Sequence, residues 1–249
     1  MQFRELEKMY RVEENHWWFA GKRALFKRLL RSRLAGANLK ILDIGSGTGA
    51  VPEDFGRFGW ICATDRSVAA LRFARSRGVE AVACCDAVSI PIANDSVDLV
   101  LAFDVLEHVD NDAGALDELT RVLKPGGAAA IHVPAWPWLW SAHDEALEHK
   151  RRYTRKSFTT LLAQSSLKIE HLGWSGATIL APAFAVRGLR RLLPDRPGET
   201  YQADLFTLPK PLNAFMRGVY DVEAAAATAI GLPFGLSLAA IATKRPEPP

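Results

Sequence analysis

The feature that most constrains the fold is the stretch LDIGSGTGA, residues 42–50, where an apolar run meets a helical pattern across three glycines. Glycine adopts positive φ angles without steric cost, so this spacing predicts a tight turn whose backbone can approach a ligand. The helix that follows presents unpaired backbone N–H groups toward that ligand. A strand, such a turn and a helix in succession indicate a sheet of parallel strands covered by helices.

From residue 39 onward, short apolar runs alternate with helical patterns, which predicts a doubly wound, mostly parallel α/β sheet. Ser67 and Gly78 mark the start and the end of one helix. The sequence predicts strands at residues 39–45, 60–65, 80–86, 97–104, 128–134, 167–174 and 236–244, and helices at residues 50–58, 67–78, 113–123 and 154–166.

Residues 224–243 form a run of twenty without a charge, which is long enough for a membrane span. Gly231, Pro233 and Gly235 interrupt its middle, however, and alanine supplies much of the rest. We therefore interpret the run as a helix end, a turn and a buried strand. A peripheral membrane contact stays open as an alternative.

The composition gives little sign of a nucleic-acid partner, because a net charge of +3 is small and such binding needs cations clustered on one face. Basic clusters at 21–33, 149–156 and 187–193 suit solvated helix faces as well as an anionic partner. The three cysteines show no disulfide framework, and the charged N-terminus lacks the apolar core of a signal peptide. We expect a cytoplasmic protein with no nucleic-acid partner, and the oligomeric state stays open.

Gly45, Gly47 and Ala50 also satisfy the dinucleotide pattern, and Asp65 lies 20 residues beyond Gly45, so an NAD enzyme is an alternative. Asp43 argues against it. A carboxylate inside an apolar strand is costly to bury. It would repel a pyrophosphate but would favour a ligand with a sulfonium and a free amino group. A carboxylate that only braces the turn is the other interpretation.

Acidic residues also close the next two strands, where Asp65 can accept the hydroxyls of a ribose and Asp86 an adenine amino group. The motifs LDIGSGTG, ATD, CDA, VDLVLAFDVLEHV and LKPGG, in this order, resemble the class I S-adenosylmethionine-dependent methyltransferases of the type 11/12 kind over roughly residues 38–175. The resemblance implies a Rossmann-like seven-stranded sheet with an antiparallel last strand. It also implies S-adenosylmethionine as the cofactor and S-adenosylhomocysteine as its product. The cofactor-binding residues that it implies are Gly45, Gly47, Gly49, Asp65, Asp86, Ala87, Asp104 and Val105. We predict Trp18, Arg23, Asp43 and Arg66 as further cofactor-binding residues.

We expect the whole chain, residues 1–249, to form a single methyltransferase domain. Its expected parts are a helical lid at 1–37, a cofactor-binding core at 38–175, an insertion at 176–234 that caps the acceptor, and a last strand and tail at 235–249.

The motif HWWF at residues 16–19 resembles a subgroup of these enzymes that is often associated with saccharide or lipid-linked glycan synthesis. Trp17, Trp18 and Phe19 can close over a sulfonium through cation–π attraction, worth ~0.5–2 kcal/mol. Arg23 follows on the same helix and can hold the methionine carboxylate. The alternative is that both tryptophans only pack the first helix.

The loop at residues 133–154 follows the fifth strand at the ligand edge and gathers aromatic, basic and histidine residues. Aromatic rings suit sugars or apolar tails, and paired arginines suit phosphate or carboxylate. We predict His143 with Asp144 as the catalytic base, with His108 as a second candidate that can also brace its loop. His132, inside an apolar strand, suits a core residue. The predicted acceptor-binding residues are Trp136, Trp140, His149, Arg151, Arg152 and Tyr153.

We predict no metal site, although His143, Asp144 and His149 form an alternative ligand set. The predicted function is O-methylation of a sugar, a lipid-linked glycan or a similar amphipathic small molecule. A quinone-like or amine acceptor is the alternative within the class. An NAD-dependent oxidoreductase and a cofactor-binding protein without catalysis are the alternatives from other classes.

Overall fold

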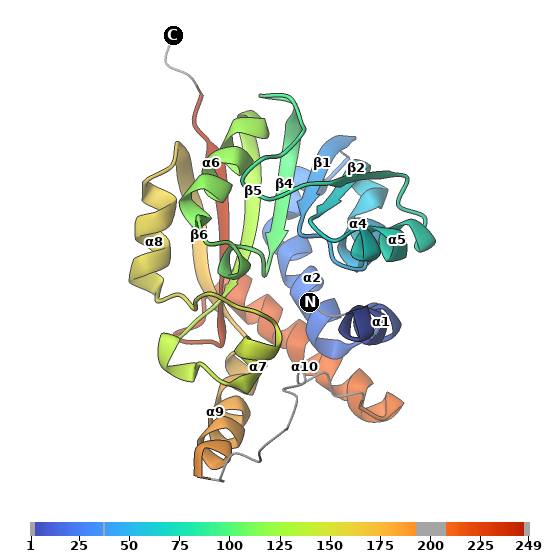
Figure 1. The fold of residues 1–249 in the computed structure, drawn as a ribbon. Helices are drawn as coiled ribbons and strands as arrows, with labels where there is room; N and C mark the ends of the chain where they lie inside the picture. Colours follow the sequence, from blue (N-terminus) through green and yellow to red (C-terminus); the bar gives the residue numbers. More distant parts are fainter. Residues whose placement is uncertain (1–2, 37, 193–207, 247–249) are drawn as a thin grey trace.

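The computed structural model describes residues 3–36, 38–192 and 208–246 (Figure 1). Within them, seven strands form one sheet in the order β3-β2-β1-β4-β5-β7-β6. The strands are β1 Leu39–Ile44, β2 Gly59–Asp65, β3 Ala81–Cys84, β4 Val97–Phe103, β5 Leu123–Pro134, β6 Leu167–Ser175 and β7 Ser237–Lys244. The helices are α1 Phe3–Val12, α2 Trp17–Leu29, α3 Arg31–Leu34, α4 Ala50–Phe55, α5 Val68–Ser76, α6 Asp112–Val122, α7 Ala142–Ala146, α8 Arg155–Ala163, α9 Ala177–Leu192 and α10 Lys210–Ala229.

The strand pairing confirms the predicted fold class. β1 pairs in parallel with β2 and β4, and parallel pairing continues to β3 on one side and to β5 on the other. β7 is antiparallel to both of its neighbours, β5 and β6. The strand order reverses between β1 and β4, and ligands of open α/β sheets bind at such a reversal, beyond the carboxyl ends of the strands.

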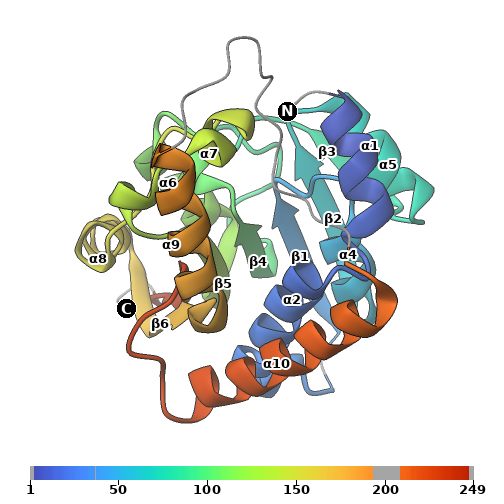
Figure 2. The same cartoon turned by 90° about the horizontal axis from the view of Figure 1, so that it is seen from below.

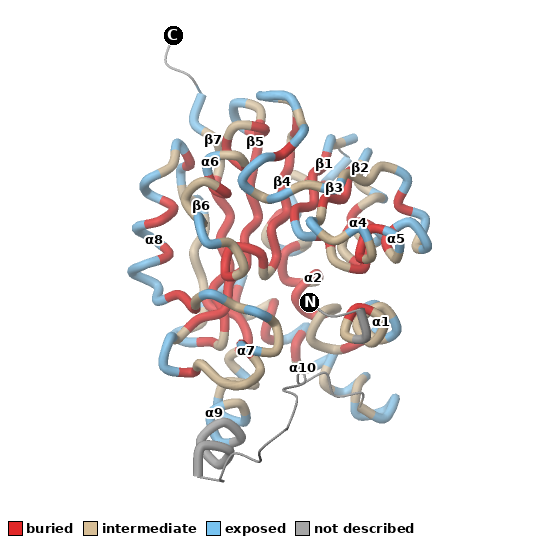
Figure 3. The backbone as a smooth tube through the Cα atoms, viewed as in Figure 1, coloured by how far each residue is buried: buried red, intermediate tan, exposed pale blue. Residues whose placement is uncertain are grey.

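Helices cover both faces of the sheet because the apolar strands alternate their side chains between two buried layers. Leu99 and Leu101 face a core built with α2, α3, α4 and α10, whereas Val100 and Ala102 face a core built with α6 and α8. Figure 3 shows the resulting buried positions concentrated in the central strands. This two-sided burial explains why the strands read as nearly continuous apolar runs.

The fifth strand starts earlier than predicted. Residues 124–127, KPGG, were expected to separate the helix from the strand, but β5 already begins at Leu123. The register with β4 shifts between Val97 and Leu99, and Gly126 has a φ of 79°, which is the geometry of a bulge. The glycines that suggested a break thus let the strand bend and continue.

The segment at 176–234 was expected to be an insertion without regular alternation, and its described residues form two helices, α9 and α10. Residues 193–207 of this segment lie outside the described residues. Alanine-rich turns and Pro182 inside α9 hid the helical pattern in the sequence. The prediction for residues 224–243 holds, because α10 ends at Ala229, a turn follows, and β7 begins at Ser237. No helix in the described ranges is long and apolar enough to span a membrane.

The N-terminal helices lie at the carboxyl ends of the strands. Figure 2, viewed from that end, shows α1, α2, α9 and α10 arranged around the strand ends. α2 and α10 pack closely: a Cβ added to Gly21 would lie 2.3 Å from Cδ1 of Tyr220. The rings of Trp17 and Trp18 also contact Tyr220, with centroids 5.9 and 5.6 Å away. The lid at residues 1–37 stays a prediction. In the second half of α2, Leu25 and Phe26 are buried and belong to the core.

Phe26 tests that assignment, because its buried ring stacks on Phe103 of β4 with centroids 4.3 Å apart. Phe26→Ala should lower the free energy of unfolding by ~3–5 kcal/mol. The matched control is Phe215→Ala on α10, where the side chain is 65% exposed. Urea denaturation of both variants measures the difference, and equal losses would show that α2 is not part of the core.

Candidate functional site

A cavity of about 1020 Å³ lies at the carboxyl ends of the parallel strands. Its lining comes from the N-terminal helices, the glycine turn, the ends of β1, β2 and β4, the segment around α7, and α9. The predicted cofactor-binding residues that line it are Trp18, Arg23, Gly45, Gly47, Asp65, Arg66, Asp86, Ala87, Asp104 and Val105. Of the predicted acceptor-side residues, His108, His143, His149 and Arg152 line it as well. The two predicted halves of the site thus share one cavity.

The glycine turn has the geometry that its sequence predicts. Gly45, Gly47 and Gly49 have φ angles of 65°, 53° and 93°. A Cβ at Gly45 would lie 2.7 Å from Cγ2 of Val105, so only glycine lets the turn pack against the end of β4. Asp65 holds the turn in place by accepting hydrogen bonds from the backbone N–H groups of Gly47 and Ser67, at 3.0 and 2.7 Å.

Gly49 has a different role from the predicted one. It is the N-cap residue of α4, and a Cβ there would lie 2.6 Å from Cα of Ala74 in α5. Among the described residues it does not contribute to the cavity lining. The third glycine therefore allows close helix packing and does not contact the cavity.

Asp43 lies under the turn, with only 2% of its surface exposed. Its Oδ2 has no hydrogen-bond partner in the part of the chain that the structure describes, and neither does Oγ of buried Ser46. Burial, followed by the charges of Asp65 and Glu13, raises the pKa of Asp43 well above its usual value. Asp43 is not among the described residues that line the cavity, and it lies directly behind the lining residues Ile44 and Gly45. A buried carboxylate oxygen without a partner is costly, so this region favours a positive group or hydrogen-bond donors nearby.

Asp104, predicted to flank the cofactor, joins three elements. It follows β4 with a φ of 57°, forms an ion pair with Nζ of Lys22 in α2, and accepts a hydrogen bond at 2.5 Å from Nδ1 of His132 in β5. Burial alone would raise the pKa of Asp104, but Lys22 and His132 outweigh it and hold that pKa well below its usual range. Nε2 of His132 lies 3.1 Å from Oγ of Ser175, so His132 is a satisfied core residue, as expected.

Lys22 is a residue that the sequence analysis missed. It is buried, lines the cavity, and links the helix after the HWWF motif to the end of β4. A lysine within a basic stretch gives no signal of its own. The partner, Asp104, is more than eighty positions away in the sequence, and only the fold brings the two together.

Arg23 does not have the arrangement predicted for a methionine-carboxylate clamp. Its Nε donates to Asp54 at 3.0 Å, and its two terminal nitrogens donate to the backbone oxygens of Glu13 and Glu14 at 3.1 and 2.7 Å. Its charge already has a carboxylate partner, and its other bonds fix the turn between α1 and α2. Arg23 lines the cavity as a structural residue, and a role in holding the carboxylate stays a prediction.

Arg77 and Glu13, also missed, tie α1 to the glycine turn. Nε of Arg77 donates to the backbone oxygen of Thr48 at 3.0 Å, and one terminal nitrogen donates to the backbone oxygen of Tyr10 at 2.6 Å. The hydroxyl of Thr48 donates to the carboxylate of Glu13. A Cβ at Gly47 would lie 3.0 Å from Cε of Met9, so α1 lies directly against the turn.

Ion pairs within the loop at residues 133–154 hold this predicted acceptor loop in place. Asp144 is fully buried and accepts from Nε of Arg152 at 2.6 Å and from Nδ1 of His149 at 2.9 Å. Arg152 also donates to the backbone oxygen of Ala135 at 2.9 Å. The predicted pairing of His143 with Asp144 as a base is therefore replaced by an Arg152–Asp144–His149 group. His143 still lines the cavity.

The predicted anion clamp of two arginines is also not formed. Arg151 lies 2.8 Å from a carboxylate oxygen of Asp112 and, like Arg152, is paired within the chain. Tyr153 is buried and donates its hydroxyl to Asp112 at 2.8 Å. Trp136 stacks on Trp174 with centroids 4.9 Å apart. These residues fasten the loop to the sheet, and neither Arg151, Tyr153, Trp136 nor Trp140 is among the described residues that line the cavity.

Beside this group lie His108 and a residue that the sequence analysis passed over, Glu107. Burial and the neighbouring His149 lower the pKa of His108 to about 4. Glu107 has no exposed surface, and burial, followed by the charge of Asp104, raises its pKa well above its usual value. Both of its carboxylate oxygens lack a partner in any other described residue. Glu107 lies in the motif DVLEHV, from which the sequence analysis took only His108 as a candidate base.

Comparisons with known proteins agree with the fold and match the part of the chain that contains the glycine turn. Residues 42–131 match the family described as a methyltransferase domain. A demethylmenaquinone methyltransferase of Corynebacterium urealyticum is 37% identical over 114 residues, which is 45% of this chain and 49% of that protein. The ubiquinone/menaquinone biosynthesis C-methyltransferase UbiE of Cupriavidus taiwanensis is 35% identical over 116 residues, which is 42% of this chain and 48% of that protein. The chain thus spans about half the length of the curated relatives it matches.

Among solved structures, an S-adenosylmethionine-dependent methyltransferase from Thermotoga maritima has a TM-score of 0.60 at 17% identity and covers 98% of both chains. The geranyl diphosphate C-methyltransferase from Streptomyces coelicolor A3(2), solved with Mg²⁺, geranyl diphosphate and S-adenosylhomocysteine, has a TM-score of 0.58 at 16% identity. That match covers 88% of this chain and 78% of the other. At these identities the likeness establishes the fold.

Asp144 offers a test of how the acceptor loop is held. Asp144→Ala leaves the guanidinium of Arg152 buried without its carboxylate, so the free energy of unfolding should fall by ~3–5 kcal/mol. The matched control is Asp110→Ala, since Asp110 is 85% exposed in its pair with Lys150 and such pairs contribute little. Chemical denaturation of both variants gives the comparison. A loss no larger for Asp144 than for Asp110 would contradict the buried ion pair.

Proposed function

The chain carries a methyltransferase domain of the class I, S-adenosylmethionine-dependent family. From this premise we propose that it transfers the methyl group of S-adenosylmethionine to an oxygen of an amphipathic small molecule. The matched region, residues 42–131, contains the glycine turn and the ends of β1, β2 and β4. The proposal for the cofactor rests on this region. The proposal for the acceptor rests on the rest of the cavity.

The observation that carries the proposal is the buried carboxylate of Asp43 beneath the glycine turn, whose Oδ2 has no partner among the described residues. Together with Asp65 and Glu13 it makes this end of the cavity acidic. A pyrophosphate would be repelled there. The sulfonium and the α-amino group of S-adenosylmethionine would instead relieve the buried charge, which separates this site from a dinucleotide site of similar sequence.

The remaining parts of the cofactor fit the ends of successive strands. Each carboxylate oxygen of Asp65 accepts one hydrogen bond from a backbone N–H group, and each can still accept another from a ribose hydroxyl. Asp86 and Ala87 line the cavity beyond β3, where adenine would lie. Val105 packs against Gly45 and would place the sulfonium near the end of β4.

Methyl transfer needs an acceptor oxygen aligned with the sulfonium and a route for its proton. The C–S bond breaks, a C–O bond forms, and the hydroxyl proton passes to a base. His108 and His143 line the cavity on the acceptor side. With a pKa of about 4, His108 is neutral at pH 7 and can accept the proton. His143 is the second candidate for the base.

The acceptor end of the cavity is partly apolar. Ile179, Pro182 and Ala183 of α9 line it, so the segment after β6 takes part in the site as an acceptor cap. Trp138 and Phe184 contact each other with centroids 5.7 Å apart and are about half exposed. An acceptor with an apolar tail suits this end, and a tail embedded in a bilayer would bring the protein to a membrane surface.

Two classes of acceptor are candidates for this site. The HWWF motif favours a sugar or a lipid-linked glycan. The named relatives act in quinone synthesis, which favours a quinone-like acceptor as the second candidate. The matched family ends at residue 131, before the loop and α9 that line the acceptor end, so the relatives' acceptors need not be shared.

Product analysis tests this proposal. The protein is incubated with S-adenosylmethionine carrying a deuterated methyl group and with lipid-linked saccharides or quinols, and the products are analysed by mass spectrometry and NMR. We expect S-adenosylhomocysteine together with a labelled O-methyl product. A labelled C-methyl product on a quinol would show that the acceptor belongs to the quinone class and not to the saccharide class. Binding of S-adenosylmethionine without turnover on either class would contradict the proposal.

A further inference from the structure

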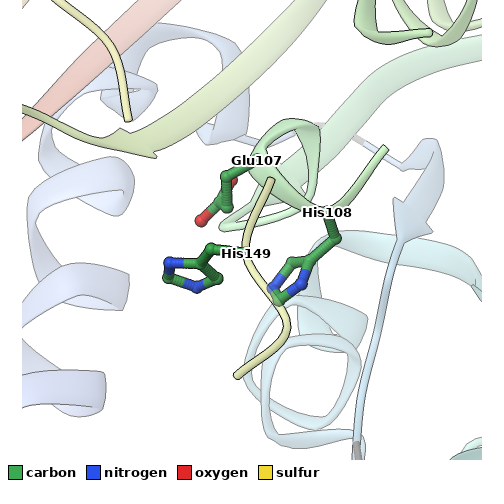
Figure 4. A group of neighbouring side chains, drawn as sticks. All are labelled: Glu107, His108 and His149. Atoms are coloured by element: carbon green, nitrogen blue, oxygen red, sulfur yellow. The ribbon is translucent and has the colours of Figure 1, made fainter. Parts of the chain in front are cut away.

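We propose that Glu107, His108 and His149 bind a divalent transition-metal cation at the acceptor end of the cavity. One potential ligand atom from each residue lies within 4.8 Å of the other two (Figure 4). All three residues line the cavity. The fold assembles the group from two separate segments, because Glu107 and His108 belong to the turn after β4 and His149 follows α7.

The carboxylate of Glu107 is the first observation that points to a ligand. It is fully buried, and neither oxygen has a hydrogen-bond partner in another residue among those the structure describes. A buried carboxylate without donors is costly. Lys22 and Arg152, the nearest cations, are already paired with Asp104 and Asp144. A cation held jointly with the two imidazoles would satisfy this carboxylate.

The orientation of His149 is the second observation. Its Nδ1 donates to Asp144 at 2.9 Å, and Arg152 fixes Asp144 from the other side at 2.6 Å. This bond holds the ring in one tautomer and leaves Nε2 to bind a metal, the arrangement that metal-binding histidines have in proteins. Asp144 is thus a positioning residue for the site. The ring of His108 lies edge-on to His149, with centroids 4.7 Å apart.

The ligand set indicates the kind of cation. Two imidazoles and one carboxylate suit zinc, cobalt, iron or nickel better than magnesium or calcium, which prefer oxygen ligands. Three protein ligands leave coordination positions open. Because the ligands line the same cavity as the cofactor-binding residues, these positions face the place where the acceptor would lie.

A step at this metal rests on the function proposed above. An acceptor hydroxyl bound to the cation would lose its proton more easily. The proton would pass to His143, the second candidate base, because His108 would then be a metal ligand. The resulting oxygen would form a bond to the methyl carbon as the C–S bond breaks, and its electrons would return to sulfur. The alternative ligand set from the sequence, His143, Asp144 and His149, is not formed, because Asp144 is bound to Arg152 and to Nδ1 of His149.

Cobalt(II) is the probe for this site. The full-length protein is treated with a chelator, dialysed and titrated with CoCl₂, and binding is followed by calorimetry and by visible absorption. We expect one cobalt per chain. Glu107→Gln and His149→Gln should each weaken binding by at least about 100-fold, and Asp144→Asn by about 10–100-fold. The matched control, His171→Gln on β6, lies outside the cavity lining and should bind cobalt like the parent.

Two results would overturn the metal site: no stoichiometric cobalt binding, or binding that both ligand substitutions leave intact. A thiolate charge-transfer band would also overturn it, because it would assign the cobalt to a cysteine such as Cys85. Titration of the same samples with S-adenosylhomocysteine separates this inference from the proposed function. Cofactor binding without cobalt binding would reject the metal site alone, and cobalt binding without cofactor binding would support the site while the proposed function fails.

Discussion

The arrangement of the site depends on one partly buried charge, the carboxylate of Asp104 at the end of β4. Lys22 from α2 and His132 from β5 neutralise it, so the N-terminal helices are tied to the sheet at the place where the cavity lies. Burial alone would raise the pKa of this carboxylate, but Lys22 and His132 outweigh burial and hold the pKa below its usual range. Its negative charge also raises the pKa of Glu107. The same residue thus links the cofactor end of the cavity to the acceptor end.

The sequence predicted what depends on local pattern. Apolar runs, Ser67 and the glycines of residues 42–50 sufficed for the strands, for most helices and for the ligand edge, because periodicity and turn chemistry are properties of neighbouring residues. Sequence analysis failed where the two partners of an ion pair depend on the fold to bring them together. Arg152 reads as an anion-binding residue until the fold pairs it with Asp144, and Lys22 reads as a solvated lysine until the fold pairs it with Asp104. α9 and the first part of α10 were missed because alanine and proline blur the helical pattern, and only the end of α10 was predicted.

The cavity explains why one family can serve different acceptors. Its cofactor end is built by the glycine turn and strand ends of residues 42–131, which is the matched region. Its acceptor end is built by the segment around α7 and by α9, which lie beyond that region. In this second part, Asp144 pairs with Arg152 and with His149, so His149 has a fixed partner. Part of the cavity lining therefore lies in residues that the comparison does not cover.

The central claim is that the end of the cavity lined by the glycine turn, Asp65 and Glu13 binds a cationic adenosine-type cofactor and rejects a dinucleotide. Calorimetric titration of the full-length protein with S-adenosylmethionine, S-adenosylhomocysteine and NAD⁺ tests it most directly. We predict binding of both sulfur ligands with a free energy of ~8 kcal/mol, which corresponds to micromolar affinity, and no heat of binding with NAD⁺. Binding of NAD⁺ with no response to either sulfur ligand would contradict the account.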